Sequence, residues 1–314
     1  MSQTYTVDEV IKAFSDFDGT YRRDHVDAAL AMRAEITPRL IELLEMVRRE
    51  PAKFADNADF AGHMYAVMLL GYFGEPRAHQ VIVDLLRLPK NPIERLFGEL
   101  ISEEMPNILY RTCDGSLEQI RQLAQDRNAY EYCRGAALGA LTYAAADGVV
   151  PRAEVLELFG TLFSKDSADP LSSFWGLLAY AAYDLYPKEL MDVIERAYEE
   201  ELIDSFLIRY EDFQVALKDS PDVRMTRVRQ KMQQRTPADF HGLMSWWAMF
   251  QESPVRPADI EMSNAPAPLV RSPAPVAKPP SARPDPMRDK LPRWQRRKLE
   301  RESAKASKQQ QRRG

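Results

Sequence analysis

Two aspartates near the start of the chain could take part in phosphoryl chemistry. Asp16 and Asp18 lie in the stretch DFDGT, where one residue separates them and Gly19 and Thr20 follow. In such an arrangement the first carboxylate can attack a phosphoryl group while the second handles a proton. The sequence therefore raises the question of whether this chain hydrolyses phosphate esters.

The residues before the two aspartates do not suit this chemistry. The motif resembles the first motif of haloacid-dehalogenase phosphatases, in which the leading aspartate follows a buried parallel strand and hence a continuous apolar run. Here Val7, Val10, Ile11 and Phe14 follow helical spacing instead, and the downstream metal motif of those enzymes is absent. We therefore expect DFDGT to be a turn after a helix, with Gly19 in a left-handed conformation.

No metal site is expected either. The chain has four histidines, namely His25, His63, His79 and His241. None of them shows His-x-x-x-His or Glu-x-x-His spacing, and there is no Cys-x-x-Cys pair. We expect His79 to be a surface or edge residue of a repeat helix.

The two cysteines do not indicate nucleophilic catalysis. Cys133 lies on an apolar helix, where a packed cysteine is the default. Cys113 precedes a helix start, which can favour a thiolate, but no base partner can be identified. The sequence thus predicts no catalytic residue and no cofactor, and we expect that the protein is not an enzyme.

A repeat of helical segments runs through most of the first 250 residues. Strand signals are almost missing, and five amphipathic segments start with a turn residue, in most cases a proline that we expect at the first helical position. The equivalent positions are Pro38, Pro76, Ser116, Pro151 and Pro187. Their spacings of 38, 40, 35 and 36 residues define a two-helix unit that must stack on its neighbours to bury its apolar face.

The pattern predicts an all-α protein with three parts. Residues 1–253 are expected to form an α-solenoid of HEAT-like two-helix repeats, with the helices that are apolar almost all round as the inner layer. A Pro-rich linker is expected at 254–287 and a basic tail at 288–314, disordered or helical on binding. The helices expected in YEDFQVAL and PADFHGLMSWWAMF should cap the open end of the stack, with Trp246 and Trp247 either packed there or exposed as peptide-binding anchors.

Charge divides the chain into an acidic body and a basic tail. The net charge is -5, but residues 288–314 carry eleven Lys/Arg and three Asp/Glu, or +8, which leaves -13 for the rest. Within the tail, the candidate nucleic-acid or anion-binding residues are Arg293, Trp294, Arg296, Arg297, Lys298 and Arg301. Docking on an acidic surface, of this chain or of a partner, and simple solubilisation are the alternatives for the tail.

A second set of basic residues follows the repeated turn residues. Its members are Arg39, Arg77, Arg152 and Lys188. A cation in the first turn of a helix opposes the macrodipole, so helix propensity does not explain these positions. They can pair between repeats with acids such as Glu75 and Asp147, or they can form a basic ladder that binds an anionic partner.

Several ordered blocks resemble an uncharacterised bacterial family, domain of unknown function 1186, whose members look like HEAT-type helical repeats. The blocks are DGTYRRDHVDAALAMRAEITPRLIELLE, LLGYFGEPRAHQVIVDLL and YPKELMDVIERAYEEELID, at residues 18–45, 69–86 and 186–204. The resemblance covers roughly the first 250 residues, implies the fold and supplies no activity. Many members of such families end in a zinc-binding SEC-C motif, but this chain has no cysteine after Cys133, so zinc binding is not implied.

Taken together, these features predict a cytoplasmic, noncatalytic binding or scaffold module. The start of the chain has no secretory signal, no apolar run approaches a membrane span, and two cysteines suit a reducing compartment. The solenoid surface would bind a protein or peptide, and the tail would bind RNA or a ribonucleoprotein. The alternatives are a protein-only scaffold whose tail grips an acidic surface, and an unrecognised enzyme.

Overall fold

The structure, a computed structural model, describes residues 5–236 and 239–250, which lie in one compact unit. All regular secondary structure of these residues is helical, so the all-α prediction is confirmed. None of the described helices is both long enough and apolar enough to cross a membrane. The predicted linker at 254–287 and the basic tail at 288–314 lie outside the described residues.

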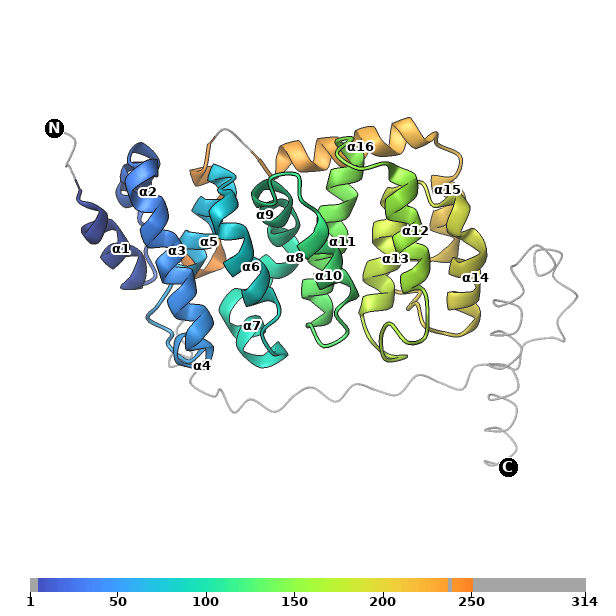
Figure 1. Ribbon diagram of the computed structural model, residues 1–314, viewed down its shortest axis with the longest axis horizontal. Helices are drawn as coiled ribbons and strands as arrows, with labels where there is room; N and C mark the ends of the chain where they lie inside the picture. The colour runs from blue at the N-terminus through green and yellow to red at the C-terminus, as the bar shows by residue number, and fades with distance from the viewer. Residues whose placement is uncertain (1–4, 237–238, 251–314) are drawn as a thin grey trace, which may run out of the picture. The chain divides into compact units, whose positions relative to one another are not determined.

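Seventeen α-helices and three 3-10 turns follow one another in the described residues (Figure 1). In chain order they are α1 Val7–Ser15, α2 Arg23–Ala31, α3 Arg33–Arg49, α4 Pro51–Ala55, α5 Gly62–Phe73, η1 Pro76–Ala78, α6 His79–Leu86, α7 Lys90–Phe97, α8 Leu100–Glu103, α9 Met105–Thr112, α10 Glu118–Gln125, α11 Glu131–Ala146, α12 Arg152–Leu162, α13 Phe174–Asp184, η2 Lys188–Leu190, α14 Met191–Glu199, α15 Tyr210–Ala216, α16 Pro221–Gln234, α17 His241–Met244 and η3 Ala248–Phe250.

The helices pack as successive pairs in two layers. The inner layer is α5, α9, α11 and α13, each packed on the next, and α3, α6, α10 and α12 flank them (Figure 1). Most residues of α5 and α11 are buried, as expected for helices that are apolar almost all round. This arrangement places the starts of successive inner helices at one side of the layer and their ends at the other. Classification of the stack as a solenoid stays a prediction.

Two glycines allow the inner helices to approach closely. A Cβ added at Gly71 of α5 would lie 2.6 Å from Cγ1 of Ile108 on α9, and one added at Gly135 of α11 would lie 2.8 Å from Cδ1 of Leu177 on α13. Both distances are shorter than a carbon–carbon contact permits, so an alanine at either position would force the facing side chain, Ile108 or Leu177, to move.

Most of the repeated turn residues lie at helix starts, but Pro38 does not. Pro76 begins η1, while Pro151 and Pro187 directly precede α12 and η2. Pro38 lies inside α3, which begins at Arg33. The prediction of a helix start at Pro38 was therefore wrong. The helix extends backwards because its first turns bury Ile36, and this packing outweighs the one hydrogen bond that an interior proline removes.

The DFDGT stretch is the turn between α1 and α2. Gly19 has φ +85°, in the left-handed region, as predicted. The Asp18 carboxylate accepts a hydrogen bond from the Thr20 backbone N–H at 2.9 Å and pairs with Arg22 at 3.0 Å. The hydrogen bond and the Arg22 charge lower the pKa of this exposed carboxyl. Asp18 thus caps a local turn after a helix and does not follow a strand.

The segment after α15 folds back along the stack. α16 packs on α11 and α13, and His241 of α17 reaches α2 and the loop before it (Figure 1). The prediction that the last helices cap the open end was therefore wrong for the helix expected in PADFHGLMSWWAMF, because His241 contacts Tyr21 and Asp27 near the start of the chain. The reason is tertiary, because α16 bonds to the ends of inner helices that lie far from it in the sequence.

Candidate functional site

The carbonyl ends of the inner helices bind arginines from other parts of the chain. At the end of α5, Arg111 donates to the carbonyls of Gly71 and Tyr72 at 2.8 and 2.7 Å, and Arg33 donates to Phe73 at 2.7 Å. The last carbonyls of a helix have no partner inside the helix and carry a partial negative charge. The arginines donate hydrogen bonds to these carbonyls and bring a positive charge to the negative end of the helix. They thereby connect α5 to α9 and α3.

α16 supplies arginines to the carbonyl ends of two further inner helices, α11 and α13. Arg229 donates to the carbonyl of Ala146 at the end of α11, at 2.6 Å. Arg224 donates to the carbonyl of Tyr183 near the end of α13 at 2.8 Å and lies 4.0 Å from the centroid of the Tyr183 ring. The Arg224 guanidinium also has Asp184 and Asp219 at 3.5 and 3.8 Å. One face of α16 is therefore fixed to the stack by charged hydrogen bonds.

Lys231 completes this contact. Its ammonium lies 2.9 Å from the Asp184 carboxylate. Burial opposes the charge of this lysine, but the attraction of Asp184 outweighs burial and raises the pKa of Lys231. Since the pKa of a lysine is already high, the pair stays charged at neutral pH.

Beyond α16 the chain reaches the N-terminal helices. Arg235 pairs with Glu104 at 2.7 Å, and the Asn107 amide donates to the Arg235 carbonyl at 2.9 Å. His241 lies 2.9 Å from both the Tyr21 hydroxyl and the Asp27 carboxylate. The inward faces of this returning segment are thus committed to intramolecular contacts.

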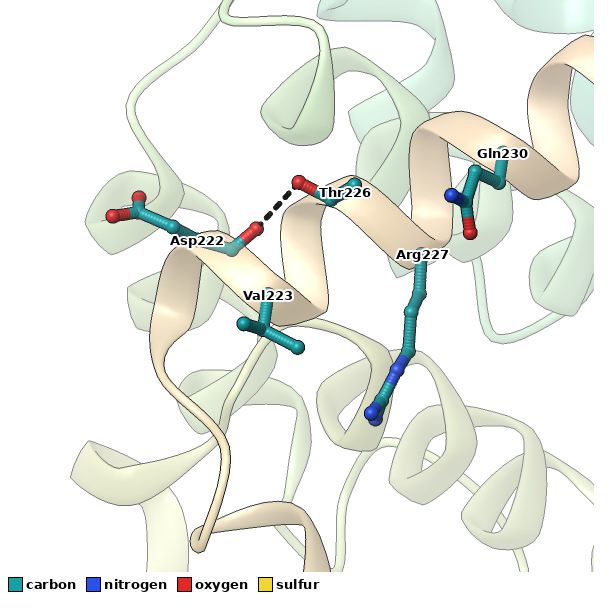
Figure 2. A pocket seen from close by; sticks show the side chains of 5 residues that line it. All are labelled: Asp222, Val223, Thr226, Arg227 and Gln230. Carbon is teal, nitrogen blue, oxygen red and sulfur yellow. Dashed lines mark hydrogen bonds between the residues drawn. The ribbon is translucent and has the colours of Figure 1, made fainter.

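The outward face of α16 borders an open groove of about 350 Å³ (Figure 2). It is lined by Asp222, Val223, Thr226, Arg227 and Gln230. Val223 is 43% exposed, Arg227 pairs with Asp219, and the Thr226 hydroxyl donates to the Asp222 carbonyl at 2.8 Å. The groove therefore offers one apolar side chain among polar side chains on a firmly mounted helix.

At the opposite ends of α11 and α13 lies a second buried arginine, Arg134. It is only 2% exposed. Its Nε donates to the carbonyl of Ala124 at 3.0 Å, its Nη1 donates to the carbonyl of Ser167 at 2.8 Å, and its guanidinium lies 3.4 Å from the centroid of the Phe174 ring. Burial lowers the pKa of Arg134 to about 10, so it remains charged at neutral pH.

Arg134 lines a pocket of about 420 Å³ where α11 and α13 begin. The wall also includes Lys90, Arg127 and Tyr130 from one side and Asp169 and Leu171 from the loop before α13. The Nη2 atom of Arg134 is buried and has no hydrogen-bond partner among the described residues. This pocket therefore contains a fixed, incompletely satisfied cation.

The predicted basic ladder is largely occupied by acids of the same chain. Arg39 pairs with Asp8 at 2.7 Å, Arg77 pairs with Glu75 at 2.7 Å, and Arg152 pairs with Glu189. Lys188 is exposed and has no ion pair within residues 5–236 and 239–250. Asp147, the other expected partner, accepts a hydrogen bond from the Tyr110 hydroxyl. The four side chains are thus spread over separate local pairs, and their binding of an anionic partner stays a prediction.

His79 is buried, so its predicted position at the surface was wrong. Its Nδ1 lies 2.9 Å from the Thr112 hydroxyl, and burial lowers its pKa to about 4. His63 is also buried and donates through Nε2 to the Leu96 carbonyl at 2.6 Å, and burial lowers its pKa to about 4. Both rings are neutral at pH 7. Among the described residues, no three His, Cys, Asp or Glu side chains gather in a possible metal site.

Both cysteines are buried thiols. Burial raises the pKa of Cys133 to about 12 and also raises the pKa of Cys113. Cys113 ends α9 and donates to the Tyr110 carbonyl at 3.1 Å, so the helix start that could have favoured a thiolate does not act on it. Neither cysteine resembles an activated nucleophile.

The two neighbouring tryptophans differ. Trp246 is 65% exposed, whereas Trp247 is half-buried and stacks on Phe250 with ring centroids 6.1 Å apart. The packed alternative thus holds for Trp247 and not for Trp246. The tail residues Arg293, Trp294, Arg296, Arg297, Lys298 and Arg301 lie outside the described residues, so their role stays a prediction.

Sequence reasoning missed α16, Arg134 and Arg224. The sequence does contain a start signal for α16, because the Ser220 side chain accepts from the Val223 N–H and Pro221 occupies the first helical position. For the two arginines no local signal exists, since an arginine in a helical segment is ordinarily exposed. Only the packed structure shows that they are buried.

Comparison with known proteins places most of the chain in one sequence family. The model of the family described as "Protein of unknown function (DUF1186)" matches residues 5–251. An uncharacterised protein of Chlamydia trachomatis is 27% identical over 214 residues, which is 68% of this chain and 85% of that protein. An uncharacterised protein of Chlamydia muridarum is 28% identical over 200 residues, or 64% of this chain and 80% of that protein. No solved structure matches the chain significantly.

Proposed function

The chain belongs to the DUF1186 family, and from this premise we propose that it is a noncatalytic binding module. In this proposal the helical stack binds a protein or peptide segment. The basic residues from Arg293 to Arg301 attach the module to RNA or a ribonucleoprotein. The role is one of holding two partners near each other.

The observation that carries the proposal is the outward face of α16. Its opposite face is fixed to α11 and α13 through Arg224 and Arg229, so the helix cannot shift easily when a partner binds. Val223 stands exposed between Asp222 and Arg227 beside the groove (Figure 2). An apolar contact with a polar rim on a rigid support is the usual anatomy of a peptide-binding surface.

The test uses capture from lysate by the full-length chain and two matched variants. Val223→Asp places a charge in the groove, and Val149→Asp makes the same change at a valine that is similarly exposed but lies in the loop before α12. We expect Val223→Asp to weaken binding of the captured protein by about 30-fold, since loss of a central apolar contact costs about 2 kcal/mol. Val149→Asp should bind like the wild type.

The tail is tested separately by deleting residues 288–314 and by adding nuclease. RNA attachment through the tail predicts that nucleic acid disappears from the eluate of the deletion variant and that its recovery falls steeply with salt. If the same proteins are recovered after nuclease treatment and without the tail, the protein-only scaffold is correct. Equal recovery by Val223→Asp and the wild type would exclude the α16 groove.

A further inference from the structure

The pocket at the beginnings of α11 and α13 contains a buried cation that forms no ion pair with a described residue. Arg134 makes no ion pair with any described residue, although its guanidinium is almost fully removed from solvent. Removing a charge from water costs several kcal/mol unless an opposite charge or hydrogen bonds compensate it. Two carbonyls compensate part of this cost at Nε and Nη1, and Nη2 remains without a partner.

The charges of the pocket wall favour a monovalent anion. Three cations, Lys90, Arg127 and Arg134, face two acids, Glu131 and Asp169, which leaves a net charge of +1 on the wall. The acids already have partners, because Asp169 pairs with Arg127 at 3.0 Å and Glu131 accepts from the Ser172 hydroxyl. One negative charge would neutralise the wall. The second charge of a phosphate dianion would meet the two acids, which repel it.

The helices and apolar residues of the pocket point to the same ligand class. α11 has 16 residues and α13 has 11, and both begin at the pocket, so their positive dipole ends favour an anion there. Ala129, Ala168 and Leu171 add apolar surface, and Leu171 is 98% exposed. The volume of about 420 Å³ falls within the range of small-ligand sites, which is about 300–1,000 Å³.

We propose that this pocket binds a carboxylate that carries a small apolar group, with the carboxylate beside the Arg134 side chain where it lines the pocket and the apolar group against Leu171. The two sources of such a ligand are a small carboxylic acid and the C-terminus of a peptide that ends in an apolar residue. The pocket is formed by other elements than the α16 groove, so the inference does not depend on the proposed function.

The test is a titration of the full-length protein labelled with 15N-arginine and observed by NMR. The Nε–H signal of Arg134 is identified by its loss in Arg134→Lys. The probes are 4-methylpentanoate, its uncharged amide and inorganic phosphate. We expect 4-methylpentanoate to shift the Arg134 signal and to bind at least 10-fold more tightly than the amide, because only the acid supplies the missing charge.

A peptide arm distinguishes the two sources. Acetyl-Gly-Gly-Leu with a free C-terminus is compared with 4-methylpentanoate and with the same peptide as an amide. Tighter binding of the free-acid peptide identifies a peptide C-terminus as the ligand, and tighter binding of 4-methylpentanoate identifies a small acid. Either result supports a carboxylate site.

Two variants that each add one negative charge test the electrostatic part of the proposal, one at the pocket edge and a matched control on α16. Asn128 lines the pocket and is exposed, so Asn128→Asp adds a negative charge there without disturbing the core. Gln233→Glu adds the same charge at an exposed position of α16. We expect about a five-fold loss of carboxylate binding in Asn128→Asp and none in Gln233→Glu, since a nearby like charge in water costs about 1 kcal/mol. The proposal is overturned if the amide binds as well as the acid, if phosphate binds more tightly, or if Asn128→Asp binds like the wild type.

Discussion

The two ends of the inner helices α11 and α13 each bury an arginine, but they compensate its charge differently. Arg224 at the carbonyl ends and Arg134 at the beginnings are 4% and 2% exposed. Both donate to backbone carbonyls, and both stack on an aromatic ring, Tyr183 or Phe174. Arg224 has two carboxylates within 4 Å, from Asp184 and Asp219, whereas the acids that attract Arg134, Asp126 and Glu131, form no ion pair with it.

The difference shows how the same side chain can serve structure at one end and remain available for binding at the other. At the carbonyl ends, the returning helix α16 supplies the arginine and the protein supplies its counter-ions, although Nε of Arg224 has no hydrogen-bond partner among the described residues. At the beginnings of the helices, the arginine comes from α11 itself, forms no ion pair with a described residue and lines an open pocket.

The largest effect is expected for Arg224→Met. The substitution keeps most of the side-chain volume but removes the cation that Asp219 and Asp184 face, and it leaves the Tyr183 carbonyl without its donor. Breaking a buried pair on one side costs about 3–5 kcal/mol. Chemical denaturation should show a loss of this size in the free energy of unfolding. A loss below 1 kcal/mol would mean that the carboxylates do not depend on Arg224.

Acidification should lower the free energy of unfolding, because buried histidines lie near both ends of α5. His63 lies at the start of α5, and His79 follows its end. In the folded protein both pKa values are about 4, below the value of 6.5 for an unfolded histidine. As the pH falls below 6.5, the unfolded chain therefore takes up protons first. The free energy of unfolding decreases until the pH reaches about 4.

Between pH 7 and pH 5 we expect a loss of about 2 kcal/mol for each histidine. Denaturation curves at a series of pH values measure it. His79→Gln, which keeps a polar side chain near Thr112, should show a smaller loss over the same range. An unchanged pH dependence in this variant would show that His79 takes up its proton without unfolding.

A smaller effect is expected for Arg134→Met. The variant loses the hydrogen bonds to the Ala124 and Ser167 carbonyls, but it also removes a buried charge that forms no ion pair with a described residue. The lost hydrogen bonds destabilise the protein and removal of the buried charge stabilises it, so we expect a net loss of about 1 kcal/mol in the free energy of unfolding. The same denaturation experiment measures it. The comparison fails if Arg134→Met costs as much as Arg224→Met.

The smallest effect is expected for Asn128→Asp, which supplies the pocket with an additional negative charge. In the absence of ligand this charge should stabilise the protein by about 0.5 kcal/mol, the usual size for an exposed ionic contact. Thermal denaturation at low salt should show a small rise in the midpoint that high salt abolishes. A decrease at low salt would show that the acids Glu131 and Asp169 dominate the pocket instead of Arg134.

The helices themselves could largely be predicted from the sequence. Apolar spacing identified the segments that became α1, α6 and α12, and the local preference of Gly19 placed the first turn. The prediction failed where several weak signals competed. Pro38 looked like a helix start, but burial of Ile36 extended α3 past it. α16 has few apolar residues, so its helical periodicity is weak although its cap at Ser220 is regular.

The candidate sites could not be predicted in the same way. His79 and Arg134 belong to residue types that are ordinarily exposed, and both became buried because a neighbouring helix or loop covers them. The partners of Arg224 come from α13 and from the turn before α16, about 40 and five residues away in sequence. Such partners leave no periodic pattern.

The sequence by itself determined the all-α class, the stacked two-helix units and the first turn, because these depend on the spacing of apolar residues and on local backbone preference. Only the tertiary structure decided that α16 returns across α11 and α13 and that Arg134 is buried beside an open pocket. The physical reason is that the balance of a buried charge depends on groups that meet only when distant helices pack.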